Sequence, residues 1–467
     1  MSTNSPGEWL SWFDRLQSED AIREAAYTSC SPIPNLSSMQ KELAAESLKT
    51  NWMKVFVPSE EHVKLLKELI EIASAFAQTR FPTINAFNRL RSSPPEDASA
   101  SQQSLCLTGL AGVSKTSLME VFQRILALKN GPRFATADQI MAIHPVRRIT
   151  ITGHLSVASI LKSMANPVLA SSSADLKLSF LQRHVRDWLG STATCALVVD
   201  EMQSFTTGSN AHALTSQFIT TCSLLGVPVI FVANYSLGHK LFNRPHEEKD
   251  RQLARPLFLS PPSADDPVWP AVIGELLSIS PGTFKLNPSQ HADEMHRYTG
   301  GLYRALRELL VLAYREVRDQ KRFEVTIEDI QRAYRSRSYS ARRIDLEALA
   351  SLSVSPLMEK IRPDLVCPFQ ELKPSGWRHQ PQSAGSTATS PTPAASIPEA
   401  LIQSTLSAAS RDTLRQLRKA AASHDGPVLK GSSRPAKPKA GPVTADALLQ
   451  GEHMLRNISS KPRGPAC

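Results

Sequence analysis

One stretch of the chain has the residue types and spacing of a phosphate-binding loop. Residues 109–116 read Gly-Leu-Ala-Gly-Val-Ser-Lys-Thr, which fits the P-loop pattern G-x-x-x-x-G-K-[ST] except that Ser114 replaces the second glycine of the pattern. In such a loop the backbone N–H groups surround a phosphate, the lysine lies against the outer phosphates and the following hydroxyl binds Mg²⁺. The stretch therefore predicts a nucleotide site formed by Gly109, Gly112, Val113, Ser114, Lys115, Thr116 and Ser117, with Thr116 also a metal ligand.

Ser114 is the departure from this pattern. Glycine tolerates backbone angles that cost a serine energy, so we expect backbone strain at this position and a slightly different loop geometry. The alternative for the stretch, taken alone, is a glycine-containing turn that happens to precede Lys-Thr and binds nothing.

A second stretch ends an apolar run in two acids. The sequence Ala-Leu-Val-Val precedes Asp200 and Glu201. Ligands of open α/β sheets sit at the carboxyl ends of the strands, so both acids are expected beside the phosphate loop. There Asp200 would bind Mg²⁺, directly or through water, and Glu201 would polarise the attacking water. An apolar strand that ends in solvated acids is the alternative.

Three further positions are weaker signals on their own. Asn234 directly follows the apolar run 227–233 and is placed to orient water near a γ-phosphate. Arg251 and Arg255 precede the last β-rich run, where an arginine could reach the nucleotide of a neighbouring subunit. Arg304 follows a Gly-Gly pair and could reach back to the nucleotide. The alternatives are a turn residue for Asn234 and solvated surface charges for the arginines.

The elements that must position these residues follow an alternating pattern. Five β-rich runs, at 104–108, 148–153, 196–200, 227–233 and 255–259, are separated by helical stretches. This pattern predicts a five-stranded parallel sheet with helices on both faces. From residue 267 to 335 the spacing is wholly helical, so an all-helical module follows the sheet. We also expect a helix to begin after Ser59 and another to be capped by Thr326 with Asp329.

Composition divides the chain further. It has 467 residues and a net charge of +10, and residues 331–467 carry the whole excess, with 20 Lys and Arg against 10 Asp and Glu. We expect an N-terminal arm over 1–50, a nucleotide-binding core over 51–262, a helical lid over 263–340, and a basic, largely disordered tail over 341–467 that binds a partner or DNA.

The amino-acid sequence also argues against several classes of protein. The apolar runs are too short to span a bilayer, and the first residues lack the pattern of a secretory signal. The six cysteines lie far apart without a C-x-x-C pair, which argues against a disulfide scaffold or a zinc site. We expect a cytoplasmic protein without a membrane partner.

The order of phosphate loop, acid pair, polar strand end, arginine and Arg-bearing helical module resembles the AAA+ ATPases. Within them the chain is most similar to the TnsC/TniB family of transposition regulators. The similarity covers roughly residues 50–340 and is carried by the stretches TGLAGVSKTSLMEVF, ALVVDEMQSF, GVPVIFVANYSLGHKLF, RQLARPLFLSPP and YTGGLYRALRELLVLAYREV. It implies an AAA+ core followed by a helical lid. The flexible N-terminal arm and the disordered basic tail lie outside the resemblance and are expected from composition alone.

The resemblance also implies a function. Such a protein uses ATP and Mg²⁺, binds double-stranded DNA with little sequence preference, assembles with its own copies into a ring or filament, and links a target-selection protein to a transposase. Carried over by position, the resemblance implies that Lys115 and Thr116 bind phosphate and Mg²⁺, and that Asp200 and Glu201 bind the metal and activate the water. It implies that Asn234 senses the γ-phosphate and that Arg304 is the sensor of the lid. Arg251 or Arg255 would be the arginine finger that acts in trans.

Contacts with DNA are harder to locate. A protein that tracks the phosphate backbone needs Lys and Arg side chains facing the duplex. The candidates are Lys129, Arg133, Arg147 and Arg148, and a solvated charge is the alternative for each. Two other functions stay open: a STAND-like signalling ATPase that oligomerises without DNA, and a scaffold that holds nucleotide but does not hydrolyse it.

Overall fold

The computed structural model describes residues 11–92, 104–127, 134–136, 139–141, 143–151, 156–165, 176–203, 211–242, 246, 249, 255–352 and 362–369. The chain divides into two compact units, Met1–Gln380 and Pro381–Cys467, and the second lies wholly outside the described residues. The predicted disordered tail beyond residue 369 therefore lies outside them too. So do three candidate site residues, Lys129, Arg133 and Arg251.

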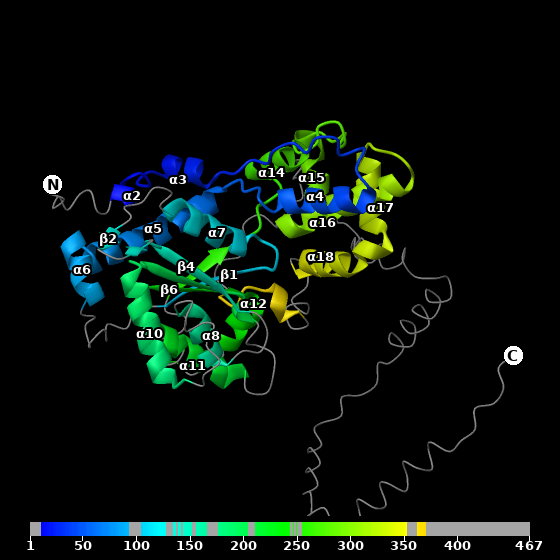
Figure 1. Cartoon of the computed structure of the whole chain (residues 1–467). Helices are drawn as coiled ribbons and strands as arrows, with labels where there is room; N and C mark the ends of the chain where they lie inside the picture. Colours follow the sequence, from blue (N-terminus) through cyan, green and yellow to red (C-terminus); the bar gives the residue numbers. More distant parts are fainter. Residues whose placement is uncertain are drawn as a thin grey trace, which may run out of the picture. The chain divides into compact units, whose positions relative to one another are not determined.

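A five-stranded parallel sheet is the centre of the first unit (Figure 1). Its strands are β1 (Ser104–Gly109), β4 (Val146–Thr150), β5 (Ala196–Asp200), β6 (Val229–Asn234) and β7 (Arg255–Leu259), and they lie in the order β4-β5-β6-β1-β7. All neighbouring pairs are parallel. The prediction of five strands in a parallel sheet is confirmed. Because β1 is internal, its end at Gly109 lies between Asn234 of β6 and Leu259 of β7.

Both faces of the sheet are covered by helices, as predicted. Side chains alternate along a strand, so Leu105 and Leu107 belong to one hydrophobic cluster and Cys106 to another. The first cluster lies under α5 (Glu60–Arg80) and α7 (Lys115–Leu126), and the second under α8 (Val157–Met164), α10 (Leu178–Ser191) and α11 (Ala211–Ser223) (Figure 1). The remaining elements of this part are α6 (Ile84–Ser92), α12 (Tyr235–Phe242), and a separate antiparallel pair, β2 (Phe134–Thr136) and β3 (Gln139–Met141).

The N-terminal segment is not a flexible arm over its described part, which corrects the prediction for residues 11–50. It forms α2 (Ser11–Asp14), α3 (Glu19–Ala26) and α4 (Lys41–Trp52), and buries Ile22, Leu48 and Trp52 completely. The indole N–H of Trp52 donates to the carbonyl of Leu276 at 2.7 Å. The helices of this segment are short, and their burial depends on surfaces contributed by later parts of the chain.

The helical module after the sheet consists of α14 (Val268–Leu277), α15 (Pro288–Thr299), α16 (Tyr303–Asp319), α17 (Ile327–Arg335), a short 3₁₀ turn η2 (Arg337–Tyr339) and α18 (Ser340–Leu352). Helix α17 begins with the predicted capping box of Thr326 and Asp329. Helix α5 begins after Ser59, also as predicted. The module extends beyond the expected boundary at residue 340, since α18 buries Leu346 and Leu349 against it.

The segment 362–369 returns to the sheet-bearing part of the chain. It contains the 3₁₀ turn η3 (Pro363–Leu365), and it packs on α12. The ring of His239 lies 2.8 Å from the carbonyl oxygen of Val366, and Phe369 contacts Phe242 and Phe258 edge-on. The described residues of the predicted tail, 341–352 and 362–369, are thus packed, and the disorder expected for the remainder stays a prediction because that remainder lies outside the described residues.

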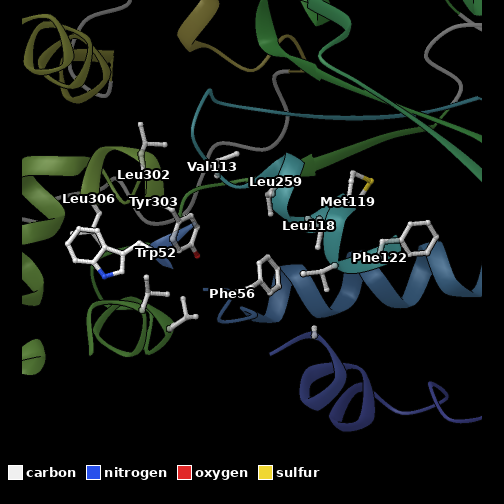
Figure 2. Close-up of a cluster of buried hydrophobic side chains, with 14 of the residues drawn as sticks. Trp52, Phe56, Val113, Leu118, Met119, Phe122, Leu259, Leu302, Tyr303 and Leu306 are labelled. Carbon is white, nitrogen blue, oxygen red and sulfur yellow. The ribbon is translucent and has the colours of Figure 1, made fainter. Parts of the chain in front are cut away.

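One hydrophobic cluster joins three segments that are far apart in the sequence. Figure 2 shows Trp52 at the end of α4, Leu118 and Phe122 of α7, and Tyr303 at the start of α16 around a common interior. All four side chains are at most 9% exposed. The phosphate-loop helix is thereby packed against both the N-terminal segment and the helical module. Within the described part of the chain, no helix has the length and apolarity needed to cross a bilayer.

Candidate functional site

The ends of the central strands and the loop after β1 enclose a single cavity. It lies at the carboxyl edge of the sheet and holds about 100 Å³ of space for water-sized molecules. Its lining includes most of the predicted nucleotide-site residues together with four that were not predicted, Ala111, Gln203, Val232 and Arg307. The lining residues are Ala111, Gly112, Ser114, Lys115, Thr116, Ser117, Asp200, Glu201, Gln203, Val232, Asn234, Arg304 and Arg307.

Lys115 occupies the centre of this arrangement. Its ammonium group donates to the carbonyl oxygens of Gly109 and Leu110 and to the side-chain oxygen of Asn234, each at 2.8 Å. The residue is only 7% exposed. Burial lowers the pKa of Lys115 to about 7, and the nearby carboxylate of Glu201 partly opposes this effect. An anion bound in the cavity would replace these neutral acceptors and restore the full charge of the lysine.

The two acids occupy the end of β5 as expected, and they have different environments. Asp200 is 1% exposed, and its carboxylate accepts the backbone N–H of Glu201 at 2.8 Å and the Arg148 guanidinium at 3.3 Å. Glu201 has a left-handed backbone, with φ of 61°, and its carboxylate accepts a hydrogen bond from the amide of Gln203. Asp200 therefore faces fixed donors, whereas Glu201 is turned into the cavity.

The donor set suits Mg²⁺. In phosphate sites Mg²⁺ is bound by oxygen ligands, of which the protein usually supplies only one or two. The cavity offers the Thr116 hydroxyl and the buried Asp200 carboxylate, and the second of these already attracts a cation in the form of Arg148. The residues present thus fit the ion that the sequence predicts.

Close backbone packing explains the two glycines of the loop. A Cβ at Gly109 would lie 2.3 Å from the carbonyl oxygen of Leu259, so only glycine fits at the end of β1. Gly112 has φ of 91°, and its carbonyl accepts the backbone N–H of Arg304 at 3.3 Å. The start of α16 is therefore docked directly on the phosphate loop, and the Arg304 side chain lines the same cavity.

Ser114 has the strain expected from its sequence position. It precedes α7 with φ of 80° and ψ of 19°, which is the left-handed region. Its hydroxyl donates to the carbonyl of Val113 and lies 2.9 Å from Nε2 of His62. Val113 itself has a fully buried side chain that packs in the hydrophobic core (Figure 2), so only its backbone can serve a ligand.

A second, more apolar cavity adjoins the first and holds about 20 Å³ of space for water-sized molecules. The two share Ser114, Ser117 and Arg307. The second cavity is lined by Trp52, Val55, Phe56, Val57, His62, Ser114, Ser117, Val272, Leu276, Tyr303 and Arg307. Its walls come from the segment before α5, from α14 and from α16, so sequence patterns did not reveal it. The only local signal was the position of His62, three residues after the helix cap Ser59.

Other predicted residues lie elsewhere. Arg255 is at the amino end of β7, away from the cavity, and forms an ion pair with Glu68 at 2.6 Å. Arg147 stacks on Trp188, with its guanidinium carbon 5.0 Å from the ring centroid. Arg148 joins the acid site described above and also contacts Glu120 at 2.9 Å. The last two arginines are thus engaged within the chain, and their contact with DNA stays a prediction.

The chain has a phosphate loop after an internal strand, an acid pair on the next strand but one, and a helical module docked on the loop. This is the α/β arrangement that the resemblance to AAA+ ATPases led us to expect. No family model matches the chain, and no curated protein matches it either.

Among solved structures, the chain is similar to the Aeropyrum pernix Orc1 protein in complex with DNA, with 16% identity over 65% of this chain and 71% of that one and a TM-score of 0.40. It is also similar to Cdc6p from Pyrobaculum aerophilum, with 14% identity over 62% and 70% and a TM-score of 0.41. For the FIGL-1 AAA domain in complex with ADP, the values are 14% identity, 60% and 87% coverage, and a TM-score of 0.33.

Proposed function

We propose that this protein is an ATP-hydrolysing switch that oligomerises on double-stranded DNA and regulates transposition, by linking a target-selection protein to a transposase. The observation that supports the ATP-dependent part is the convergence of Lys115, Asp200, Asn234 and Arg304 on one cavity beside the phosphate loop. These residues come from four separate elements, and a glycine-containing turn without a ligand would not require them to meet.

In this proposal the chain binds the triphosphate by its charge and the base by its shape. The N–H groups at the start of α7 have no partners within the helix and face the phosphates. Lys115 exchanges its carbonyl acceptors for phosphate oxygens, and Arg304 and Arg307 add positive charge from α16. The base would lie against the adjoining apolar side chains, among them Phe56 and Tyr303, which must move apart to admit it because the space between them is only about 20 Å³.

Hydrolysis then depends on the end of β5. Water attacks the γ-phosphorus, its proton passes toward the Glu201 carboxylate, and the bond to the β-phosphate oxygen breaks to give ADP and phosphate. Asn234 orients the water, since its amide lies beside Lys115. Thr116 and Asp200 would hold Mg²⁺, which supplies neutralisation of the phosphate charge when bound.

Assembly and DNA binding rest on the sequence. The proposed trans-acting finger is Arg251 or Arg255, and Arg255 lies at the amino end of β7, away from the chain's own cavity. The positive charge of residues 331–467 would attract an anionic polymer, and the TnsC/TniB-like motifs favour a role in transposition. Contacts with DNA through Lys129 and Arg133 belong to the same proposal.

The first experiment tests nucleotide binding. We expect saturable binding of a fluorescent ATP analogue in the presence of Mg²⁺, and loss of it in Lys115→Ala. The matched control is Lys67→Ala, because Lys67 forms a surface ion pair with Glu19 and lies outside the cavity. Absence of saturable binding by the wild-type protein would refute the proposal.

The second experiment separates hydrolysis from binding. Glu201→Gln is expected to bind the analogue as the wild type does but to release phosphate at least about a hundredfold more slowly. Equal rates of phosphate release would leave Glu201 without a catalytic role and would favour a scaffold that holds nucleotide.

The third experiment addresses DNA. Filter binding with duplex DNA should show ATP-dependent retention, little preference among sequences, and affinity that falls steeply with salt. The variant with Lys129→Ala and Arg133→Ala should lose retention but keep nucleotide binding. If the protein retains no DNA at low salt while still assembling with ATP, the signalling type of ATPase is the better description.

A further inference from the structure

The phosphate loop has a serine where its conformation favours glycine. Ser114 adopts φ of 80°, and residues with a Cβ pay for this region through a clash with the following carbonyl oxygen. A serine is therefore held there only when its surroundings favour it. Since the next backbone N–H groups along α7 point toward the cavity, a shift of Ser114 into an ordinary conformation would turn the loop away from a bound phosphate.

His62 is the residue that contacts the Ser114 side chain from outside the loop. The two residues are 52 positions apart, and Nε2 of His62 lies 2.9 Å from the Ser114 hydroxyl oxygen. On the other side of the ring, Nδ1 accepts the backbone N–H of Ser59 at 3.1 Å. A backbone N–H can only donate, so Nδ1 has no proton, and the neutral ring carries its proton on Nε2 and donates to Ser114.

The hydrogen bonds from the His62 ring continue through Ser114 to the backbone of the phosphate loop. The Ser114 hydroxyl, having accepted from His62, donates its own proton to the carbonyl of Val113. The hydrogen-bond chain thus runs from the Ser59 N–H through His62 to Ser114 and ends on the backbone of the loop. Each donor and acceptor along it has a partner, which is the condition under which a buried polar chain gives a rigid arrangement.

The position of His62 is itself tightly constrained. It is 2% exposed, and its ring packs edge-on against Phe56 at 5.1 Å and near Tyr303 at 6.1 Å. Phe56 and Tyr303 line the apolar cavity, and His62 lines it too. Burial lowers the pKa of His62 to about 4, so the ring stays neutral near pH 7 and keeps the proton arrangement described above.

We infer that His62 is a positioning residue for nucleotide binding, which holds Ser114 in the left-handed conformation that the phosphate loop needs. His62 and Ser114 together take the place of the loop glycine. The hydrogen bond from His62 offsets the free energy that a serine, unlike a glycine, loses in the left-handed conformation. This inference rests on the proposed nucleotide site. It also connects the first turn of α5 to the loop, since His62 belongs to the capping box of that helix.

A double-mutant cycle tests this role. The dissociation constant of a fluorescent ATP analogue is measured with Mg²⁺ for the wild type, His62→Ala, Ser114→Gly and the double variant. His62→Ala should weaken binding roughly tenfold in the chain with Ser114, which is the size of the conformational penalty. In the chain with Ser114→Gly the same substitution should change the constant less than about twofold, because glycine needs no support.

Two further variants separate positioning from general stability. Leu69→Ala removes a buried side chain of α5 two turns beyond His62 and leaves every contact of the His62 ring in place, including that of the Ser59 hydroxyl with Nδ1 at 2.8 Å. It should therefore lower the melting temperature without weakening nucleotide binding. Should His62→Ala not fold, His62→Gln provides a second variant, since glutamine fits the same position of a capping box, and it is compared in both backgrounds.

The outcomes are distinct. A loss of affinity on His62→Ala that is the same with serine and with glycine at position 114 would overturn the inference, because the histidine would then act without Ser114. A weaker binding of the analogue in Leu69→Ala, equal to that in His62→Ala, would also overturn it in favour of helix stability. Absence of binding by the wild-type protein would refute the proposed nucleotide site itself.

Discussion

His62 makes the stability of the fold sensitive to acid in a way that one substitution isolates. Burial lowers its pKa from 6.5 to about 4, so between these values the unfolded chain binds a proton that the folded chain does not. The stabilisation that depends on the neutral ring is fully present above 6.5, the pKa of His62 in the unfolded chain. It declines as the pH falls toward about 4, the pKa of His62 in the folded chain. The shift corresponds to roughly 3 kcal/mol in total, of which about 2 kcal/mol is lost by about pH 5.

The assay is urea unfolding of the wild type and of His62→Gln at about pH 7.5 and about pH 5. Fluorescence of the buried Trp52 and Trp269 reports the transition. We expect His62→Gln to be less stable at the higher pH, because contacts are lost. At the lower pH the gap should narrow by about 2 kcal/mol, because glutamine does not titrate.

Other buried groups titrate in both proteins, so their contributions cancel in this comparison. His296, for example, also has a pKa lowered by burial, and it is unchanged by the substitution. A gap that is the same at both pH values would show that His62 titrates normally. It would contradict the buried, neutral ring on which the hydrogen-bond chain to Ser114 depends.

Three further substitutions test the packing around the site by thermal and urea unfolding. Gly109→Ala places a Cβ 2.3 Å from the Leu259 carbonyl oxygen and should cost about 3 kcal/mol, whereas Gly190→Ala, with nothing within 4 Å, should cost under about 1 kcal/mol. Asp329→Asn removes the buried negative charge that pairs with two arginines and weakens a helix cap, and should cost roughly 2 kcal/mol, measured against Asp319→Asn at the surface. Leu48→Ala, in the segment predicted to be a flexible arm, should cost about 3 kcal/mol, and a loss below about 1 kcal/mol would restore that prediction.

The sequence by itself determined the sheet and the order of the motifs. Apolar β-rich runs such as 196–200 and 227–233 identify strands because a buried parallel strand must be apolar on both faces. A phosphate loop is contiguous in the chain, so Lys115 and Thr116 could be assigned without any tertiary contact. The strain at Ser114 followed from the same local chemistry, since the conformational preference of a serine does not depend on its neighbours.

The tertiary structure decided how the loop is supported and where the segments outside the motifs lie. His62 meets Ser114 only because α5 packs beside α7, and no spacing along 52 residues could indicate it. The apolar cavity combines three distant segments, and Arg148 finds its partner Asp200 across neighbouring strands. The N-terminal helices are short, and a short helix is held by tertiary packing rather than by its own sequence. Their burial could not be predicted because it depends on surfaces that the rest of the chain must first assemble.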